Sequence, residues 1–184
     1  MKKILILTVM LFGWVTFSSA QKIAIVDMSY LLKNIPMYES ANEQLKQISQ
    51  KWQKEVDALN EEAELLYKNY QTESVFLSDE MKRKKENEIV AKEKQASDLK
   101  RTYFGPDGEY YKKRESLMKP IQDEVYVAVK DIADTKGYQV VLDKSSSQNL
   151  IYFSVKVDIS DEVLEKLGYE DIIKYMYEHQ DEEF

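Results

Sequence analysis

The run K-I-A-I-V-D at Lys22–Asp27 has a counterpart in Y-Q-V-V-L-D at Tyr138–Asp143, and both are short apolar stretches that end in an aspartate. About 110 residues separate them, rich in charge and almost free of glycine. Runs of β-branched residues favour strands, whereas stretches rich in Glu, Lys, Gln, Leu and Ala favour helix. The sequence therefore predicts an α+β fold, in which a small sheet takes its strands from both ends of a long helical excursion.

The first half of the excursion has the spacing of a helix with one apolar seam. After Leu45, the apolar positions are separated by 4, 3, 4, 3 and 4 residues, as in a heptad pattern: Trp52, Val56, Leu59, Ala63, Leu66 and Tyr70. A helix of about 33 residues from Tyr38 would be roughly 50 Å long. This is too long for a compact domain of this size, so we predict a protruding arm over about residues 38–119.

The second half returns along the first. The pattern breaks at Val75–Leu77, and Ser78 begins a new helix as its N-cap. Ile89, Ala96, Leu99 and Tyr103 continue a heptad-compatible spacing there. The arm is thus predicted to be a helical hairpin with its tip near residues 72–78. Gly105-Pro106-Asp107-Gly108 and Pro120 predict a bent or broken return limb, with Gly137 as the helix stop.

After the arm we expect the strand at residues 138–143 to form a hairpin with a second strand at Leu150–Phe153. Ser160 is predicted to cap a short helix over Asp161–Leu167 that ends at Gly168. An acidic tail over residues 169–184 follows, either as an amphipathic turn or two on the base or as a loose segment.

The first 20 residues have the pattern of a cleavable export signal. Two lysines precede a near-continuous apolar run over Ile4–Val15, and Ser18-Ser19-Ala20 supplies small residues for cleavage. A membrane anchor would need about 20 apolar residues, more than this run contains. We expect a mature chain from residue 21 that is exported to the periplasm of a bacterial envelope, either soluble or peripheral to its membranes.

Charge is distributed unevenly along the chain. There are 26 Lys and Arg against 33 Asp and Glu. Residues 81–119 contain twelve basic and seven acidic side chains, whereas residues 120–184 contain six basic and fifteen acidic ones. The positive charge on the returning arm is either a solvated helix face or a surface that favours anionic partners.

The sequence gives little support to an enzyme. It has no cysteine and a single histidine, His179, and its glycines form no phosphate-binding loop. Asp27 and Asp143 are interpreted as strand-end turn or capping residues rather than paired catalytic carboxylates. We predict no catalytic, cofactor-binding or metal-binding residues and no cofactor.

The order of these segments is similar to that of a known family. The combination of K-I-A-I-V-D, a charged helical hairpin, L-M-K-P-I-Q at Leu117–Gln122, G-Y-Q-V-V-L-D at Gly137–Asp143 and D-I-S-D-E-V at Asp158–Val163 resembles the Skp/OmpH family of periplasmic chaperones. The resemblance covers about residues 21–168. It implies a jellyfish-like homotrimer with a β-rich base and three arms, a holdase for unfolded outer-membrane proteins that uses no nucleotide and no covalent chemistry. This chain differs from the best-known members in being acidic overall, in its Gly105–Gly108 break and in its tail.

Three groups of residues are candidates for these roles. Candidate client contacts, which could equally close the hairpin and fill its seam, are Tyr67, Tyr70, Val75, Phe76, Leu77 and Tyr103. Candidate contacts to acidic clients, anionic lipid or lipopolysaccharide are Lys82, Arg83, Lys84, Lys85, Arg101, Lys112, Lys113 and Arg114. The apolar strand residues expected to hold a trimer base together are Ile23, Ile25, Val140, Leu142, Ile151 and Phe153.

Functions of other classes remain open at this point. A structural coiled-coil adaptor of the envelope would need the same arm but a single folded partner. A nucleic-acid binder conflicts with export and with the negative net charge, so no nucleic-acid partner is predicted. An envelope hydrolase would need a nucleophile–base pair that the sequence does not offer.

Overall fold

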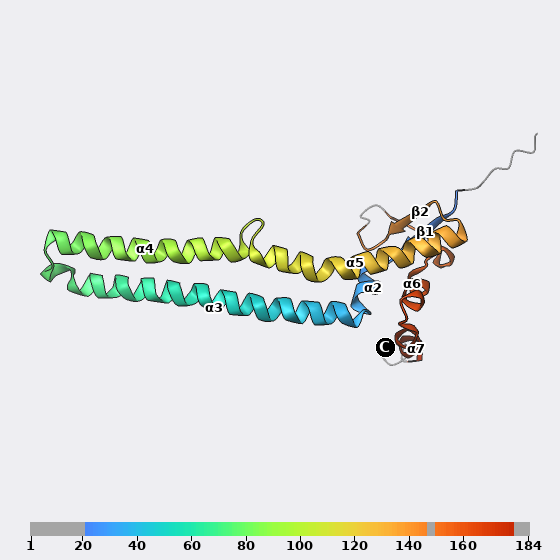
Figure 1. Cartoon of the computed structure of the whole chain (residues 1–184), viewed down its shortest axis with the longest axis horizontal. Helices are drawn as coiled ribbons and strands as arrows, with labels where there is room; N and C mark the ends of the chain where they lie inside the picture. Colours follow the sequence, from blue (N-terminus) through green and yellow to red (C-terminus); the bar gives the residue numbers. More distant parts are fainter. Residues whose placement is uncertain (1–20, 147–149, 179–184) are drawn as a thin grey trace, which may run out of the picture.

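A computed structural model describes residues 21–146 and 150–178 of the chain. Figure 1 shows a long two-helix arm that projects from a small base, as the sequence predicts. The expected leader at residues 1–20, three residues of the loop after the second strand and the end of the tail with His179 lie outside the described residues.

The outgoing limb of the arm is one helix, α3, at Pro36–Glu73. It begins two residues before the predicted start because Pro36 occupies its first turn, where the fixed φ of proline suits a helix and its missing N–H is not needed. The heptad positions lie on the packed side, with Leu45, Val56 and Ala63 buried. The predicted seam is therefore confirmed.

The tip lies where the sequence placed it. A single 3₁₀ turn, η1 at Ser74–Phe76, reverses the chain before α4 at Asp79–Phe104. Ser78 is the N-cap of α4, and its Oγ accepts a hydrogen bond of 3.3 Å from the Met81 N–H. The two helices of the arm pack on each other along one apolar seam, so each stabilises the other. Near the base, Ala41 and Leu45 of α3 also pack into the buried core with residues of the returning chain.

The returning limb is interrupted once, at the Gly105–Gly108 turn. Figure 1 shows this turn as a loop that stands out from the limb between α4 and α5, which spans Glu109–Lys136. Helix α5 continues through Pro120 and ends at Gly137, whose φ of 72° is the left-handed conformation that glycine adopts readily. The break at the Gly105–Gly108 turn and the helix stop are confirmed, while Pro120 does not divide the helix.

The base contains a two-stranded sheet of β1 at Ile23–Val26 and β2 at Val140–Asp143. The strands are parallel, and the register pairs Ile23 with Val140 and Val26 with Asp143. The expected hairpin between residues 138–143 and Leu150–Phe153 is wrong, because Leu150–Phe153 forms no strand. The other edge of β1 is instead used by the chain before the next helix, where the Ile159 N–H donates to the Ile25 carbonyl at 2.9 Å.

Three short helices complete the base: α2 at Met28–Lys33, α6 at Ser160–Lys166 and α7 at Glu170–Glu178. The short turn η2 at Val155–Val157 precedes α6. Ser160 is the first residue of α6, and the N-cap is Ile159. The Ser160 hydroxyl oxygen accepts a hydrogen bond from the Asp27 N–H at the end of β1 instead. The tail forms α7, and Ile173 packs into the base core with Leu31, Val125, Val163 and Leu164.

Candidate functional site

The outer face of the sheet is an apolar surface that the chain covers only in part. Ile23, Ile25, Val140 and Leu142 share this face, since they pair in register two by two and alternate with the residues that face the core. Ile25 is buried, but Ile23, Val140 and Leu142 remain 43%, 45% and 41% exposed. Four of the six residues predicted for the trimer base are thus brought together on one face.

The segment after the sheet adds further exposed apolar side chains. Ile151 and Tyr152 are 98% and 83% exposed, and Val155 is 81% exposed at the start of η2. Phe153 is half-buried, and the Lys144 ammonium lies 5.2 Å from the centre of its ring. Large apolar side chains are seldom left this exposed in one short segment, and contiguous apolar patches mark interaction surfaces.

The two strand-end aspartates have the capping roles that the sequence predicts. Asp27 accepts a hydrogen bond of 2.9 Å from the Tyr30 N–H and caps α2. Asp143 accepts from the Met28 N–H at 3.1 Å and from the Ser145 N–H and hydroxyl. Burial alone would raise the pKa of Asp143, but the hydrogen bonds from serine and from the backbone outweigh it and lower the pKa.

At the far end of the arm, the tip exposes two apolar side chains. Val75 is 77% and Phe76 87% exposed, whereas Leu77 is half-buried against the hairpin. Tyr67, two turns before the tip on α3, is 49% exposed. Of the predicted client contacts, these residues have free surface available for a partner.

Tyr70 and Tyr103 are placed differently, because both join the two helices of the arm. The Tyr70 hydroxyl hydrogen-bonds Glu86, which together with burial and the carboxylate charge raises the pKa of Tyr70. The Tyr103 hydroxyl donates to Glu55, and this raises the pKa of Tyr103 in the same way. Both tyrosines act in the seam of the arm.

An aromatic cluster at the Gly105–Gly108 turn was missed by sequence reasoning. Trp52 of α3 stacks on Tyr103 with ring centres 4.8 Å apart and an angle of 10° between the planes. Phe104 meets the edge of Trp52 at 6.4 Å and contacts Tyr110 at 6.2 Å across the break. The signal was present in the sequence, since Trp52 and Tyr103 are seam positions and a pair of aromatic residues stands on each side of the turn.

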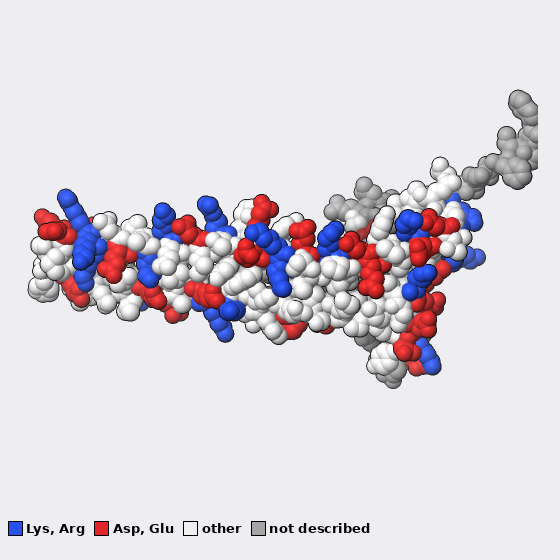
Figure 2. All heavy atoms as spheres, in the orientation of Figure 1, with Lys and Arg blue, Asp and Glu red and all other residues white. Residues whose placement is uncertain are grey.

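The predicted basic residues all lie on α4 and α5. Figure 2 shows that cationic side chains are interspersed with acidic ones along the arm. Lys85 pairs with Glu73 at 2.5 Å across the hairpin, and Lys112 pairs with Glu109 at 2.9 Å. The other six, half-buried or exposed, are Lys82, Arg83, Lys84, Arg101, Lys113 and Arg114. On the face shown, the arm therefore presents cations interspersed with acidic side chains rather than one continuous positive surface.

Within the described ranges, no helix is both long and apolar enough to cross a membrane. The same residues include no group of three or more His, Cys, Asp or Glu side chains arranged to hold a metal ion.

Comparison with known proteins identifies the fold. A single two-helix arm on a small mixed base defines a class of protein built to present a long projecting surface. The sequence profile of OmpH-like outer membrane proteins matches residues 22–167, and the chain belongs to this OmpH-like family. The fold is also similar to the crystal structure of a candidate outer membrane chaperone (OmpH-like) from Caulobacter crescentus CB15. The TM-score is 0.63 at 13% sequence identity, over 81% of this chain and 85% of the other. No curated protein matches the chain.

Proposed function

We propose that this protein is a periplasmic holdase chaperone that binds unfolded outer-membrane proteins and prevents their aggregation without nucleotide or covalent chemistry. One observation carries the proposal: a helical hairpin with a single internal seam leaves apolar side chains at its tip uncovered, with Val75 and Phe76 77% and 87% exposed. Family membership and the chaperone described for the Caulobacter crescentus relative support the same role.

The chemistry of binding follows from weak apolar contacts. Burial of apolar surface contributes about 25 cal/mol per Å², so one side chain such as Phe76 gives only a modest affinity. Several arms that surround one chain would add their contacts through effective concentration. A holdase of this kind needs many exposed apolar contacts and no deep pocket.

Self-association would supply the several arms. The base exposes apolar side chains on the sheet face, at Ile23, Val140 and Leu142. It also exposes Ile151 and Tyr152 in the segment that contacts the end of β2 through Phe153 and Lys144. We propose that this surface, called here the assembly surface, joins three copies into a homotrimer. The separated cations of α4 and α5 would then attract acidic clients, anionic lipid or lipopolysaccharide by long-range charge rather than by one binding site.

The holdase activity is tested by diluting a urea-denatured β-barrel protein into buffer with and without the mature chain. Turbidity should fall at a stoichiometric amount of trimer. Phe76→Ser together with Val75→Ser should weaken this protection at least severalfold, whereas Val127→Ser, a matched change at a 55% exposed position on α5, should not. Unchanged turbidity with the wild-type chain would refute the chaperone proposal.

The assembly state is tested separately by light scattering. The mature chain should have about three times its monomer mass, and Ile151→Glu should lower that mass, while Val90→Glu on the arm should leave it unchanged. A structural adaptor remains the second candidate, because hydrogen bonds and ion pairs between α3 and α4 make the arm a stiff spacer. Cross-linking from arm positions that captures one folded species would favour the adaptor.

A further inference from the structure

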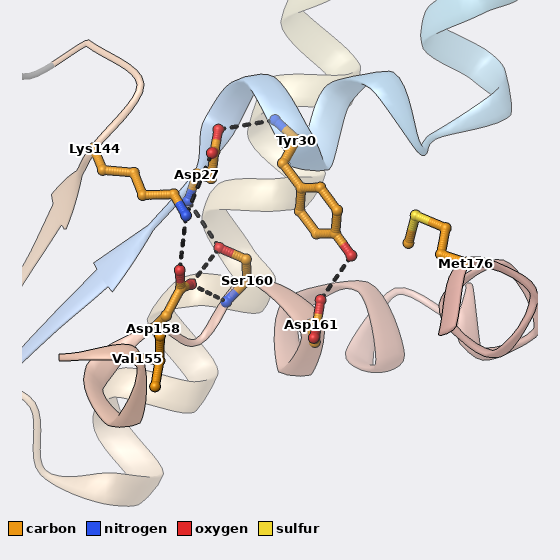
Figure 3. Close-up of a pocket in the computed structure, with 8 residues that line it drawn as sticks. All are labelled: Asp27, Tyr30, Lys144, Val155, Asp158, Ser160, Asp161 and Met176. Carbon is orange, nitrogen blue, oxygen red and sulfur yellow. Dashed lines mark hydrogen bonds and ion pairs between the residues drawn. The ribbon is translucent and has the colours of Figure 1, made fainter. Parts of the chain in front are cut away.

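A lysine at the end of the sheet contacts two carboxylates and an aromatic ring. Lys144 directly follows β2, and its backbone N–H donates to the Val26 carbonyl at 2.8 Å. Its ammonium lies 2.9 Å from an Asp158 oxygen and 3.5 Å from an Asp27 oxygen. Figure 3 shows this ammonium between the two carboxylates, which come from the end of β1 and from the segment before α6. The side chain therefore joins three separate parts of the base.

The two carboxylates are themselves held in place by their other oxygens. Asp27 Oδ1 accepts from the Tyr30 N–H, so that Oδ2 is left to face Lys144. Asp158 Oδ1 accepts from the Ser160 N–H at 3.0 Å and from its hydroxyl at 2.6 Å, and Oδ2 faces Lys144. The buried Ser160 Oγ in turn accepts from the Asp27 N–H at 2.8 Å. The position of the ammonium is thus determined before any partner arrives.

The remaining neighbour of the ammonium is an aromatic ring. Phe153 lies over Lys144, with 5.2 Å between the nitrogen and the ring centre, within the range of a cation–π contact. Phe153 is next to Tyr152 and two residues from Ile151, the most exposed apolar side chains of the base. The segment forms no strand of its own, so this contact holds it near the sheet end.

We propose that Lys144 is a positioning residue for self-association, whose ammonium fixes Phe153 and so holds Ile151 and Tyr152 in place to meet a second copy of this chain. The proposal rests on the homotrimer proposed above. A segment ordered in advance loses less conformational freedom when it binds, and this strengthens association without adding any contact to the partner. The matching partner is a second copy because this segment contacts, through Phe153 and Lys144, the end of the same strand whose outer side chains Val140 and Leu142 also remain exposed.

The test measures the association constant of the mature chain by light scattering and sedimentation across a concentration series. Phe153→Leu keeps an apolar side chain but removes the ring, and it should weaken association about tenfold, since each protomer of a trimer loses one contact. Phe153→Tyr keeps the ring and should remain within about threefold of wild type. Lys130→Met, which removes an exposed ion pair with Asp134 on α5, is the matched lysine control and should have no effect.

Lys144→Met should weaken association at least as much as Phe153→Leu, and the double variant should be no weaker than Lys144→Met alone, because both changes remove the same contact. If Lys144→Met fails to fold by circular dichroism, the comparison of Phe153→Leu with Phe153→Tyr still decides. Association of Phe153→Leu equal to wild type, with Ile151→Glu still disruptive, would overturn the role of Lys144 but keep the trimer. A wild-type chain that stays monomeric at every concentration would overturn both.

Discussion

Replacement of Val56 by alanine tests whether the arm depends on its single seam. Val56 is 1% exposed. It lies between two polar contacts that join the helices of the hairpin, the hydrogen bond of Tyr103 with Glu55 and the ion pair of Lys92 with Glu62. Val56→Ala removes two methyl groups, which costs about 1.6 kcal/mol in transfer free energy, and the cavity left behind raises the loss to about 2–3 kcal/mol. Alanine is also a better helix former than valine, which returns about 0.5 kcal/mol.

The chain offers a matched control for this change. Val90 lies in the middle of α4 but is 60% exposed, so Val90→Ala makes the same chemical change in the same arm without burial. Its expected effect is between zero and a stabilisation of about 0.5 kcal/mol, from helix propensity alone. The difference between the two variants therefore isolates packing in the seam, and it should be about 2 kcal/mol or more.

Urea unfolding followed by circular dichroism gives the free energy of unfolding, and hydrogen exchange locates the change. A loss of 2 kcal/mol in the arm should speed exchange of the α3 amides around Val56 by about thirtyfold, with little change for amides of the base. If Val56→Ala and Val90→Ala have equal effects, the arm is not held together by the seam described above.

Three further predictions concern the base and the two turns. Burial alone would raise the pKa of Asp158, but hydrogen bonds from Ser160 and Lys144 lower it, and the pKa of Asp143 is lowered as well. The stability that these two carboxylates contribute is present above the unfolded pKa of about 3.9 and is lost as the pH falls through their lower folded values. The thermal midpoint should therefore be level from pH 7 to 5 and drop below pH 4, less steeply in Asp158→Asn. Gly108→Ala should lower the free energy of unfolding in urea by about 1–3 kcal/mol, because the new Cβ would lie 2.8 Å from the Tyr103 carbonyl oxygen. Asp107→Gly should be neutral or stabilising, since Asp107 has a φ of 58°, which glycine adopts more readily. Gly137→Ala meets open space and should cost only about 1 kcal/mol, from its φ of 72°; a larger loss than for Gly108→Ala would contradict the assignment of strain.

The helical part of the fold could be predicted from the sequence because its information is local. Heptad spacing located the seam of α3, and its interruption at Val75–Leu77 located the tip. The residue types themselves located the cap at Ser78 and the break at the Gly105–Gly108 turn. Each depends on residues within one or two turns of one another. The capping roles of Asp27 and Asp143 were predictable for the same reason, since a strand end followed by polar residues calls for a side chain that accepts backbone hydrogen bonds.

What the sequence could not supply is the pairing of distant segments. Leu150–Phe153 has strand-forming residues, yet β1 bonds on one side to β2 and on the other to the chain at Ile159. Tyr103 is an aromatic residue of the kind that binds partners, but its ring stacks on Trp52 of the opposing helix within the hairpin. Likewise, nothing in the local pattern shows that Lys144 lies between carboxylates that are 117 and 14 residues away in the sequence.

The parallel pairing of β1 with β2 also constrains the order in which the chain folds. Ile23 pairs with Val140, so the sheet cannot form until the whole arm has been synthesised and the two ends of the arm have come together. Closing a loop of this length is entropically costly in a flexible chain, and such distant contacts form slowly. The α3–α4 hairpin joins neighbouring segments and can fold first, which shortens the effective loop and returns the chain to its starting point. The arm would thus act as the folding nucleus of its own base.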